Sequence, residues 1–190
     1  MRNRLFVALI LNEDSLIEIN KFRERIYPSD NKVKWEGLDK LHLTIKYLGD
    51  VGEELIPKLN EKLVAIIKKH DKVEIKFAKF SVIKKYSVPK ILWLGIKATK
   101  RLEDLFNDIN FGLSELGFKK ESRKFKPHIT FLRLRGNEDI LKLESLKNTQ
   151  LNLKSSTIDE VALIKSDLRS TGSTYTKIKS FKLNTGGLNG

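Results

Sequence analysis

Two histidines of this 190-residue chain lie in matching frames, each followed two positions later by a threonine. The stretch KLHLTIKYLGD places His42 before Thr44, and the stretch KPHITFLRL places His128 before Thr130. On a β-strand, residues i and i+2 project from the same face, so each pair offers one imidazole and one hydroxyl to the same space. Because the chain has only three histidines, two such frames indicate a shared role.

Two such pairs facing each other would place two titratable rings and two hydroxyls around one ligand. Imidazole titrates near pH 6.5, so one ring can be neutral while the other is protonated, which provides a general base and a general acid. Threonine hydroxyls donate to anionic oxygens. This set suits a phosphodiester: one imidazole takes a proton from water, the other protonates the departing ribose oxygen, and the hydroxyls hold the phosphoryl oxygens.

No metal ion or other cofactor is expected for this chemistry. The chain has no cysteine, and no cluster of acidic residues and histidines near the two motifs resembles a metal site. The third histidine, His70, precedes Asp71 at a predicted helix end and is interpreted as a structural residue.

Apolar periodicity predicts the elements that carry these residues. The first motif falls on an alternating run at 41–48 and the second on a run at 128–134. A helix that starts near Asp14 is predicted to end at Tyr27-Pro28, because proline cannot continue it. Further strands are predicted near 4–11, 33–36, 73–84, 90–97, 158–165 and 175–183, and further helices near 53–69, 99–116 and 138–147.

The order of these elements repeats along the chain. The two motif histidines lie 86 residues apart (128 − 42), and at that offset the strand at 4–11 falls on 90–97. A whole series that matches at one offset indicates a duplication. We therefore predict an α+β fold over residues 1–183, a single domain of two pseudo-symmetric lobes, each an antiparallel sheet with outer helices, flanking a central cleft. Residues 184–190 are predicted to form a flexible tail.

Charge and hydropathy restrict the partners. Lys and Arg outnumber Asp and Glu by 37 to 24, and the net charge of +13 favours nucleic acid as a partner, although a lysine-rich proteome would show the same excess. No apolar run approaches about 18 residues, so no contact with a membrane is expected. The apolar run at 5–11 is interpreted as a core strand, and a cytoplasmic monomer without an obligate protein partner is expected.

The sequence resembles the 2H phosphoesterase superfamily, and most of all its RNA 2',3'-cyclic phosphodiesterases, or 2'-5' RNA ligase-like proteins. The resemblance covers nearly the whole chain. It is carried by RLFVAL, Trp35, LHLTIKYLG, ILWLGI, KPHITFLR and SDLRSTGSTYTKIKSFKL.

This resemblance implies an α+β fold whose two motifs line a central cleft. It also implies hydrolysis of a 2',3'-cyclic phosphate at an RNA end to a 2'-phosphate, without a metal ion. By the same resemblance His42 matches the proton donor and His128 the proton acceptor, while Thr44 and Thr130 match the positions that bind phosphate.

Arg133 matches an arginine that the family often has five residues after the second histidine, where it could bind phosphate bidentately. Its odd offset, however, places it opposite His128 on a regular strand, so it reaches the cleft only if the strand bends or bulges; otherwise it has a surface or structural role. Lys46 is predicted to share the face of His42, either near an RNA phosphate or in solvent.

Aromatic residues near the motifs have two interpretations, stacking on a nucleobase or packing in the core. They are Phe6, Trp35, Tyr47, Trp93 and Phe131.

The paired motifs favour a phosphodiesterase but leave its exact use open. The same two groups could open small cyclic nucleotides, or join RNA ends through a 2'-5' linkage by reversal. A noncatalytic RNA-binding module is the alternative of another class, and the two intact His-x-Thr pairs argue against it, because binding alone needs no pair of titratable rings.

Overall fold

The computed structural model describes residues 2–26, 33, 35–136, 138, 140–146, 153–169 and 172–185. The predicted helix end at Tyr27-Pro28 and residues 186–190 of the predicted tail lie outside this range. The strands are β1 (Arg2–Ile10), β2 (His42–Gly52), β3 (Val73–Ile75), β4 (Phe77–Lys85), β5 (Val88–Ile96), β6 (His128–Arg133), β7 (Ser156–Ile158), β8 (Glu160–Arg169) and β9 (Gly172–Lys182). The helices are α1 (Glu13–Ile26), α2 (Ile56–Ile67), α3 (Lys100–Ser114) and α4 (Ile140–Ser145), with short 3-10 helices at Leu38–Lys40 and Glu53–Leu55.

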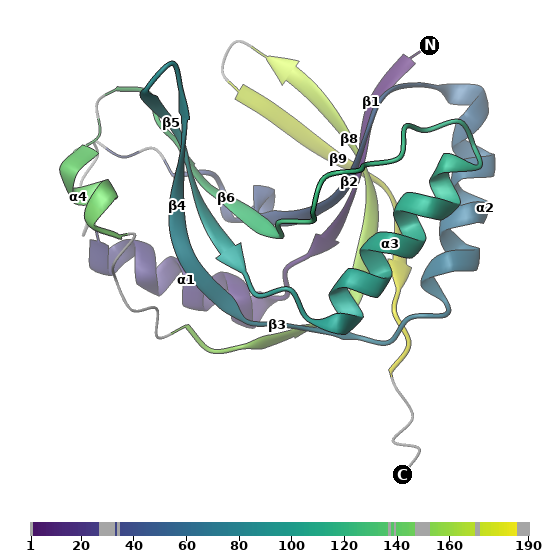
Figure 1. Ribbon diagram of the computed structural model, residues 1–190, viewed down its shortest axis with the longest axis horizontal. Helices are drawn as coiled ribbons and strands as arrows, with labels where there is room; N and C mark the ends of the chain where they lie inside the picture. Colours follow the sequence, from purple (N-terminus) through teal and green to yellow (C-terminus); the bar gives the residue numbers. More distant parts are fainter. Residues whose placement is uncertain are drawn as a thin grey trace.

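Seven strands form one curved sheet in the order β4-β5-β6-β2-β1-β8-β9, and β3 pairs with β7 in a small second sheet (Figure 1). The strand pairings are antiparallel, which confirms the predicted α+β class. The sequence predicted a separate sheet for each lobe, whereas the two sets of strands meet in one sheet. They meet narrowly, because β2 and β6 pair only at Leu43 and Ile129, a contact called the join below.

The strands on the two sides of the join follow the same order. The sheet runs β2-β1-β8 on one side and β6-β5-β4 on the other. The two residues of the join are themselves 86 positions apart (129 − 43), as are both ends of β1 and β5. The strand pairing departs from this offset by one residue. Leu9 pairs with Leu43, and the residue that pairs with Ile129 is Leu94, which lies 85 positions after Leu9 (94 − 9). The strand order outward from the join is thus similar on its two sides.

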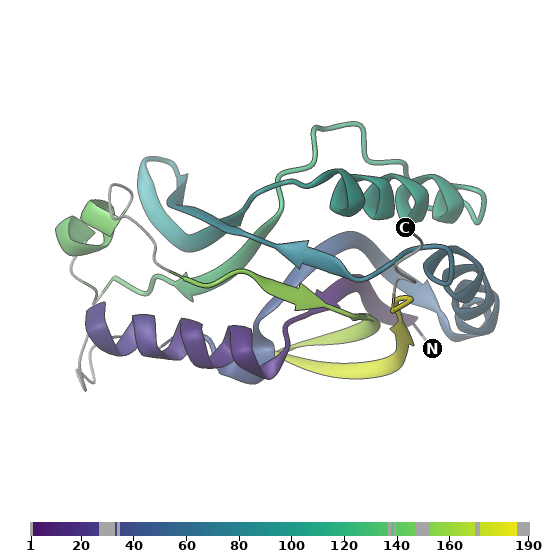
Figure 2. The same ribbon diagram turned by 90° about the horizontal axis from the view of Figure 1, so that it is seen from below.

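Helices from each half pack on strands of the other half. Phe22 of α1 stacks on Phe80 of β4 with ring centroids 5.3 Å apart and contacts Phe131 of β6 edge-on at 6.3 Å. Helix α3 in turn contacts β2 and lies beside α2, while α1 lies apart from both (Figures 1 and 2). Buried apolar residues of both halves consequently form one continuous main core.

Local signals located the start of α3 but not every element, because the predicted strand near 73–84 is two strands, β3 and β4, in different sheets. Thr99 caps α3 as predicted, with its Oγ1 accepting from the backbone N–H of Leu102 at 3.4 Å. The predicted strand at 33–36 is wrong, because Val33, Trp35 and Glu36 lie outside any strand.

The start of the predicted tail is hydrogen-bonded to the domain. Asn184 donates its backbone N–H to the carbonyl of His70 at 2.9 Å and accepts from the N–H of Lys72 at 3.0 Å. Among the described helices, none combines the length and apolar character needed to cross a membrane.

Candidate active site

The two motif histidines stand at the join. His42 begins β2 and His128 begins β6, each one residue before the residue that pairs there. The paired residues are fully buried, so the histidines and the two motif threonines project from the opposite face of the sheet. Antiparallel pairing at the join sets His42 beside Thr130 and Thr44 beside His128, as one set of four side chains.

Both imidazoles are held in the same tautomer. His42 Nδ1 donates to the carbonyl of Lys40 at 2.8 Å, and His128 Nδ1 donates to the carbonyl of Lys126 at 2.8 Å. Because a carbonyl oxygen only accepts, each Nδ1 carries a hydrogen, and Nε2 of each neutral ring is left as an acceptor. Both rings therefore offer Nε2 for proton transfer.

His42 contacts two aromatic rings that also contact each other. Its ring centroid is 4.8 Å from that of Phe6 and 5.3 Å from that of Tyr175. Burial lowers the pKa of His42 below its usual value of 6.5, because the charged ring loses water. The hydrogen bond to Lys40 opposes this shift, and the positive charges of Arg133 and His128 add to it. The free protein thus favours neutral His42.

A cavity of about 470 Å³, the main cavity, opens beside the join. Of the residues predicted for the site, His42, Thr44, Thr130 and Arg133 line it. His128 is not one of the lining residues; its ring lies 4.8 Å from that of Trp93 on the neighbouring strand β5, and its charge acts on His42.

A β-bulge on β6 turns Arg133 into the main cavity. The pairing with β5 skips Phe131, which is an extra residue in the strand. Phe131 and Leu132 are consequently both buried, and the alternation of faces shifts by one position beyond them. Arg133 therefore lines the cavity, as was predicted for a strand that bulges before it.

The equivalent bulge occurs on β2. The pairing with β1 skips Ile45, which lies 86 positions before Phe131 (131 − 45). Regular alternation from Leu43 would place Tyr47 on the core face of β2. Tyr47 instead lies beyond this bulge and lines the main cavity with 53% of its surface exposed, because the bulge breaks the alternation.

The prediction for Lys46 is wrong for the same reason. Its side chain is buried away from the face of His42, and its Nζ donates to Asn110 Oδ1 at 2.6 Å and to the carbonyl of Lys119 at 2.8 Å. Lys46 therefore links β2 to α3 and to the segment that follows it.

Arg23 of α1 is a buried residue beneath the site that sequence reasoning missed. Its Nη1 donates to the carbonyl of Glu36 at 2.8 Å and its Nη2 to the carbonyl of Phe131, the bulged residue, at 3.2 Å. Burial lowers the pKa of Arg23 to about 10, against the opposing charge of Glu36. The Glu36 carboxylate also pairs with Arg133 Nε at 3.2 Å. Arg23 thus holds both backbone segments that determine the position of Arg133.

Other lining residues were also missed. Ser166 of β8 and Ser173 and Tyr175 of β9 line the main cavity. They belong to the closing stretch SDLRSTGSTY, whose likeness to the family was the available signal, but no spacing rule connected it to the distant motifs.

The aromatic residues near the motifs divide between the two predicted roles. Phe131 is fully buried and packs in the core, and Phe6 is buried against His42. Trp35 and Tyr47 line the main cavity, where a base could meet them. Trp93 contacts His128.

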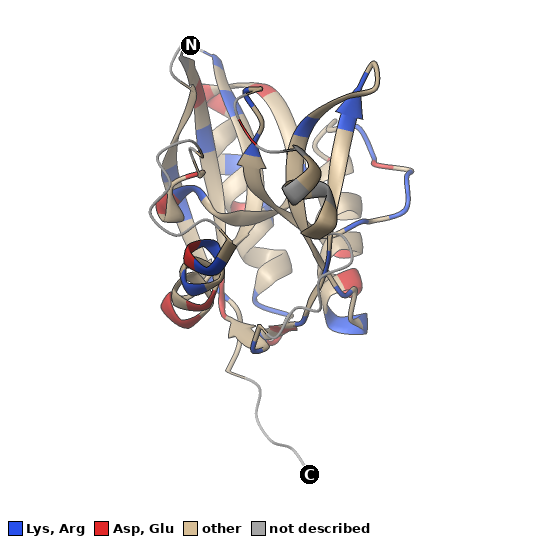
Figure 3. Cartoon of the chain, turned by 90° about the vertical axis from the view of Figure 1, so that its left-hand side faces the viewer, with Lys and Arg blue, Asp and Glu red and all other residues tan. Residues whose placement is uncertain are grey.

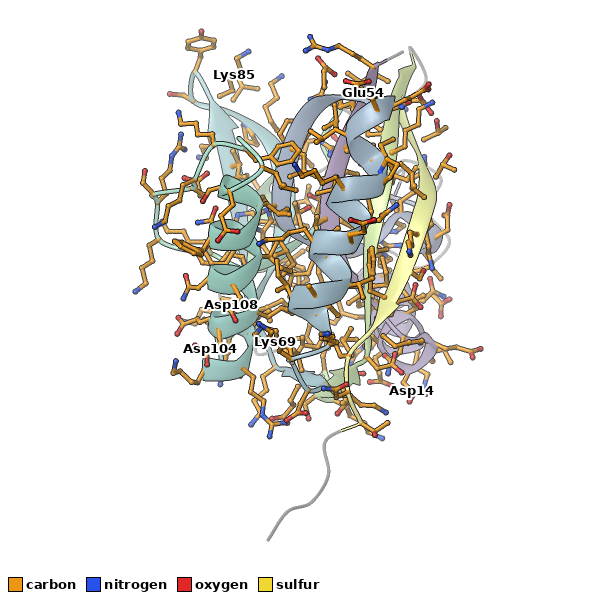
Figure 4. The ribbon with its side chains drawn as sticks, turned by 90° about the vertical axis from the view of Figure 1, so that its right-hand side faces the viewer. Asp14, Glu54, Lys69, Lys85, Asp104 and Asp108 are labelled. Atoms are coloured by element: carbon orange, nitrogen blue, oxygen red, sulfur yellow. The ribbon has the colours of Figure 1, made fainter. Side chains whose placement is uncertain are left out.

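The third histidine lies elsewhere. His70 Nε2 contacts Asp108 Oδ2 at 3.0 Å, and Figure 4 labels Asp108 on α3 and Lys69, the residue before His70. Within the described part of the chain, no group of three or more His, Cys, Asp or Glu side chains could hold a metal ion.

Comparison with known proteins finds relatives that share one name and a solved structure that shares the fold. A protein of Methanothermobacter thermautotrophicus named RNA 2',3'-cyclic phosphodiesterase is 27% identical over 185 residues, which are 96% of this chain and 100% of the relative. A protein of Thermotoga maritima with the same name is 30% identical over 132 residues, or 70% of each chain. The crystal structure of E. coli LigT in apo form shares the fold, with a TM-score of 0.72 at 22% identity, covering 96% of this chain and 98% of that one.

A family model described as the 2'-5' RNA ligase superfamily matches residues 13–169, a range that includes both His-x-Thr strands, both bulges and Arg133. The resemblance seen in the sequence is thereby confirmed, and the chain belongs to the 2'-5' RNA ligase superfamily.

Proposed function

We propose that this protein hydrolyses the 2',3'-cyclic phosphate at the end of an RNA chain and leaves a 2'-phosphate. One observation carries the proposal: two imidazoles, each fixed through Nδ1 by a backbone carbonyl, present Nε2 from the two strands that meet at the join. The named activity of the relatives from M. thermautotrophicus and Methanocaldococcus jannaschii, RNA 2',3'-cyclic phosphodiesterase, supports it.

In the proposed mechanism His128 is the base and His42 the acid. His128 Nε2 takes a proton from water, and the oxygen of that water forms a bond to phosphorus. The bond from phosphorus to the 3'-oxygen breaks, and His42 gives its Nε2 proton to that oxygen. His42 ends neutral and His128 protonated, and exchange with solvent restores both.

Substrate binding would prepare His42 for its role as donor. In the free protein burial lowers the pKa of His42, so the ring favours its neutral form. A phosphodiester anion beside the ring stabilises the charged form and raises that pKa. The substrate therefore promotes protonation of the acid that it needs.

The phosphoryl oxygens have three proposed partners. Within the described residues, the hydroxyls of Thr44 and Thr130 make no hydrogen bond, so both can donate to the phosphate. The third partner is Arg133. Its Nε pairs with the Glu36 carboxylate, so its Nη groups can donate to the phosphate.

The same proposal includes a cytoplasmic, monomeric enzyme without a cofactor. A chain without cysteine forms no disulfide and is therefore compatible with the reducing cytoplasm. The substrate is an RNA end, consistent with the net charge of +13.

The test is an oligonucleotide that ends in a 2',3'-cyclic phosphate, incubated with the protein and a chelator. We expect conversion to the 2'-phosphate, and a loss of about 10²–10⁴ in rate for His42→Ala and for His128→Ala. His70→Ala is the matched control and should retain the wild-type rate, because His70 pairs with Asp108 and does not line the main cavity. A cyclic end that persists at high protein concentration rejects the proposed function. A cyclic end that both variants still open at the wild-type rate rejects the proposed mechanism.

A further inference from the structure

The segment that links α3 to β6 is strongly basic. Over residues 119–126 the sequence reads KKESRKFK, with five cations and one acidic residue, Glu121. The five cations are exposed, and Figure 3 shows Lys and Arg along this segment at the edge of the molecule. Within the described residues, Lys119, Lys124 and Lys126 have no acidic partner. The segment, called the basic loop below, therefore presents charge that the protein does not neutralise.

Interior residues hold the basic loop in place. Lys46 Nζ donates to the carbonyl of Lys119 at 2.8 Å, and Asn110 accepts from the N–H of Glu121 and donates to its carbonyl, both at 2.9 Å. Lys46 and Asn110 are themselves buried, at 5% and 4% exposure, and bonded to each other. A loop anchored in this way offers its cations with little further ordering when a ligand binds.

A second cavity of about 470 Å³ lies between the basic loop and β2. Its walls include Lys119, Lys120 and Arg123 of the loop. Tyr47 lines both this cavity and the main cavity. Each has the volume of a typical small-ligand site, enough for one nucleotide.

Charge favours this exit from the main cavity for an anionic chain. From the segment at 35–40, which forms another part of the wall, Glu36 and Lys40 line the cavity, one acidic residue against one lysine. The basic loop has an excess of four positive charges (5 − 1). Phosphates that leave the main cavity are thus attracted past Tyr47 and toward the loop.

We propose that the second cavity and the basic loop bind the nucleotide that precedes the reacting end of the RNA. Tyr47, which lines both cavities, stacks on a base, and Lys120 and Arg123 bind the backbone phosphates beside it. This inference rests on the proposed function, because it assumes that the cyclic phosphate occupies the main cavity. It makes oligonucleotides, rather than cyclic mononucleotides, the preferred substrates.

The experiment compares kcat/KM for a 2',3'-cyclic mononucleotide and for a tetranucleotide with the same cyclic end. The variant is Lys120→Glu with Arg123→Glu, and the control is Lys68→Glu with Lys69→Glu, two exposed residues after α2 that line neither cavity. We expect the loop variant to lose at least about 10-fold on the tetranucleotide and less than about twofold on the mononucleotide. Its slope of log kcat/KM against log salt should fall by about 1.4, for two single-strand phosphate contacts. The control should match wild type on both substrates.

Three results overturn the inference. They are a wild-type enzyme that prefers the mononucleotide, a loop variant that loses equally on both substrates or on neither, and a control that loses as much as the loop variant. In each of these cases the cyclic end is still cleaved and the proposed function stands. Failure of the wild type to open either substrate rejects the proposed function and this inference together.

Discussion

His42 and His128 share one hydrogen-bonding frame but differ in their surroundings. Each donates Nδ1–H to the carbonyl two residues before it, so the His-x-Thr strand itself sets the tautomer. Of the two histidines, His42 alone contacts two aromatic rings and lines the main cavity. Burial and the nearby cations lower the pKa of His42, so in the free protein this ring binds a proton less readily than an exposed histidine does.

The charge of Arg133 should be measurable in the titration of His42. In a pH series followed by NMR, we expect the pKa of His42 to lie below 6.5 in the wild type and to rise in Arg133→Gln, because a repelling positive charge is removed. Since the proposed donor must be protonated, kcat/KM should fall as pH rises through this pKa, and the fall should move to higher pH in the variant.

Arg135→Gln is the matched control for this titration. Arg135 lines the same cavity, but its charge is not among those that shift the pKa of His42. A His42 pKa that is unchanged or lower in Arg133→Gln, or one that rises equally in Arg135→Gln, would contradict the assignment.

At the scale of elements, the two bulges decide which side chains reach the site. The His-x-Thr spacing alone predicted the face of His42 and Thr44, because no irregularity separates them. Tyr47, Lys46 and Arg133 each follow a bulge, so period-two alternation gives the wrong face of the sheet for each of them. Nothing in the local sequence marks an extra residue such as Phe131, since a buried apolar residue fits a regular strand equally well.

Arg23 gives a test of how the β6 bulge is held. Arg23→Lys keeps a cation, but one ammonium cannot reproduce the two-pronged donation to the carbonyls of Glu36 and Phe131. We expect a loss of about 1–3 kcal/mol in the free energy of unfolding. We also expect kcat/KM on a cyclic RNA end to fall by up to about 100-fold, because Arg133 is displaced.

A double-mutant cycle separates positioning from simple destabilisation. If Arg23 acts through Arg133, then Arg23→Lys should reduce kcat/KM little further in an Arg133→Gln background. Fully additive losses would mean that Arg23 does not act through Arg133. Arg25→Lys, an exposed change on the same helix, should leave both stability and kcat/KM near wild type.

At the scale of the whole molecule, the fold depends on packing exchanged between its halves. The sequence predicted an 86-residue repeat of strands and helices, because each strand and helix has its own apolar period. The single sheet and the crossing of α1 onto β4 and β6 were not, since they depend on contacts between segments more than fifty residues apart.

Exchanged packing predicts that both halves unfold together. The chain has two tryptophans, and Trp35→Phe leaves a reporter in the second half while Trp93→Phe leaves one in the first. In urea we expect coincident fluorescence transitions for the two variants. Adding Phe22→Ala should lower the free energy of unfolding by about 3–5 kcal/mol in both, because Phe22 packs on the strands of the other half. Two separate midpoints, or a loss confined to one reporter, would show independent lobes.

Tyr47 and Arg133 occupy matching places beyond the two bulges, yet one is an aromatic ring and the other a cation. If both walls were alike, a cyclic phosphate could be seated in either of two poses related by a half-turn, and either ribose ester could be opened. Two unlike walls leave a single pose. The regiochemistry of the product, one phosphate isomer rather than a mixture, would then originate in this difference between the two walls and in the unlike surroundings of the two histidines.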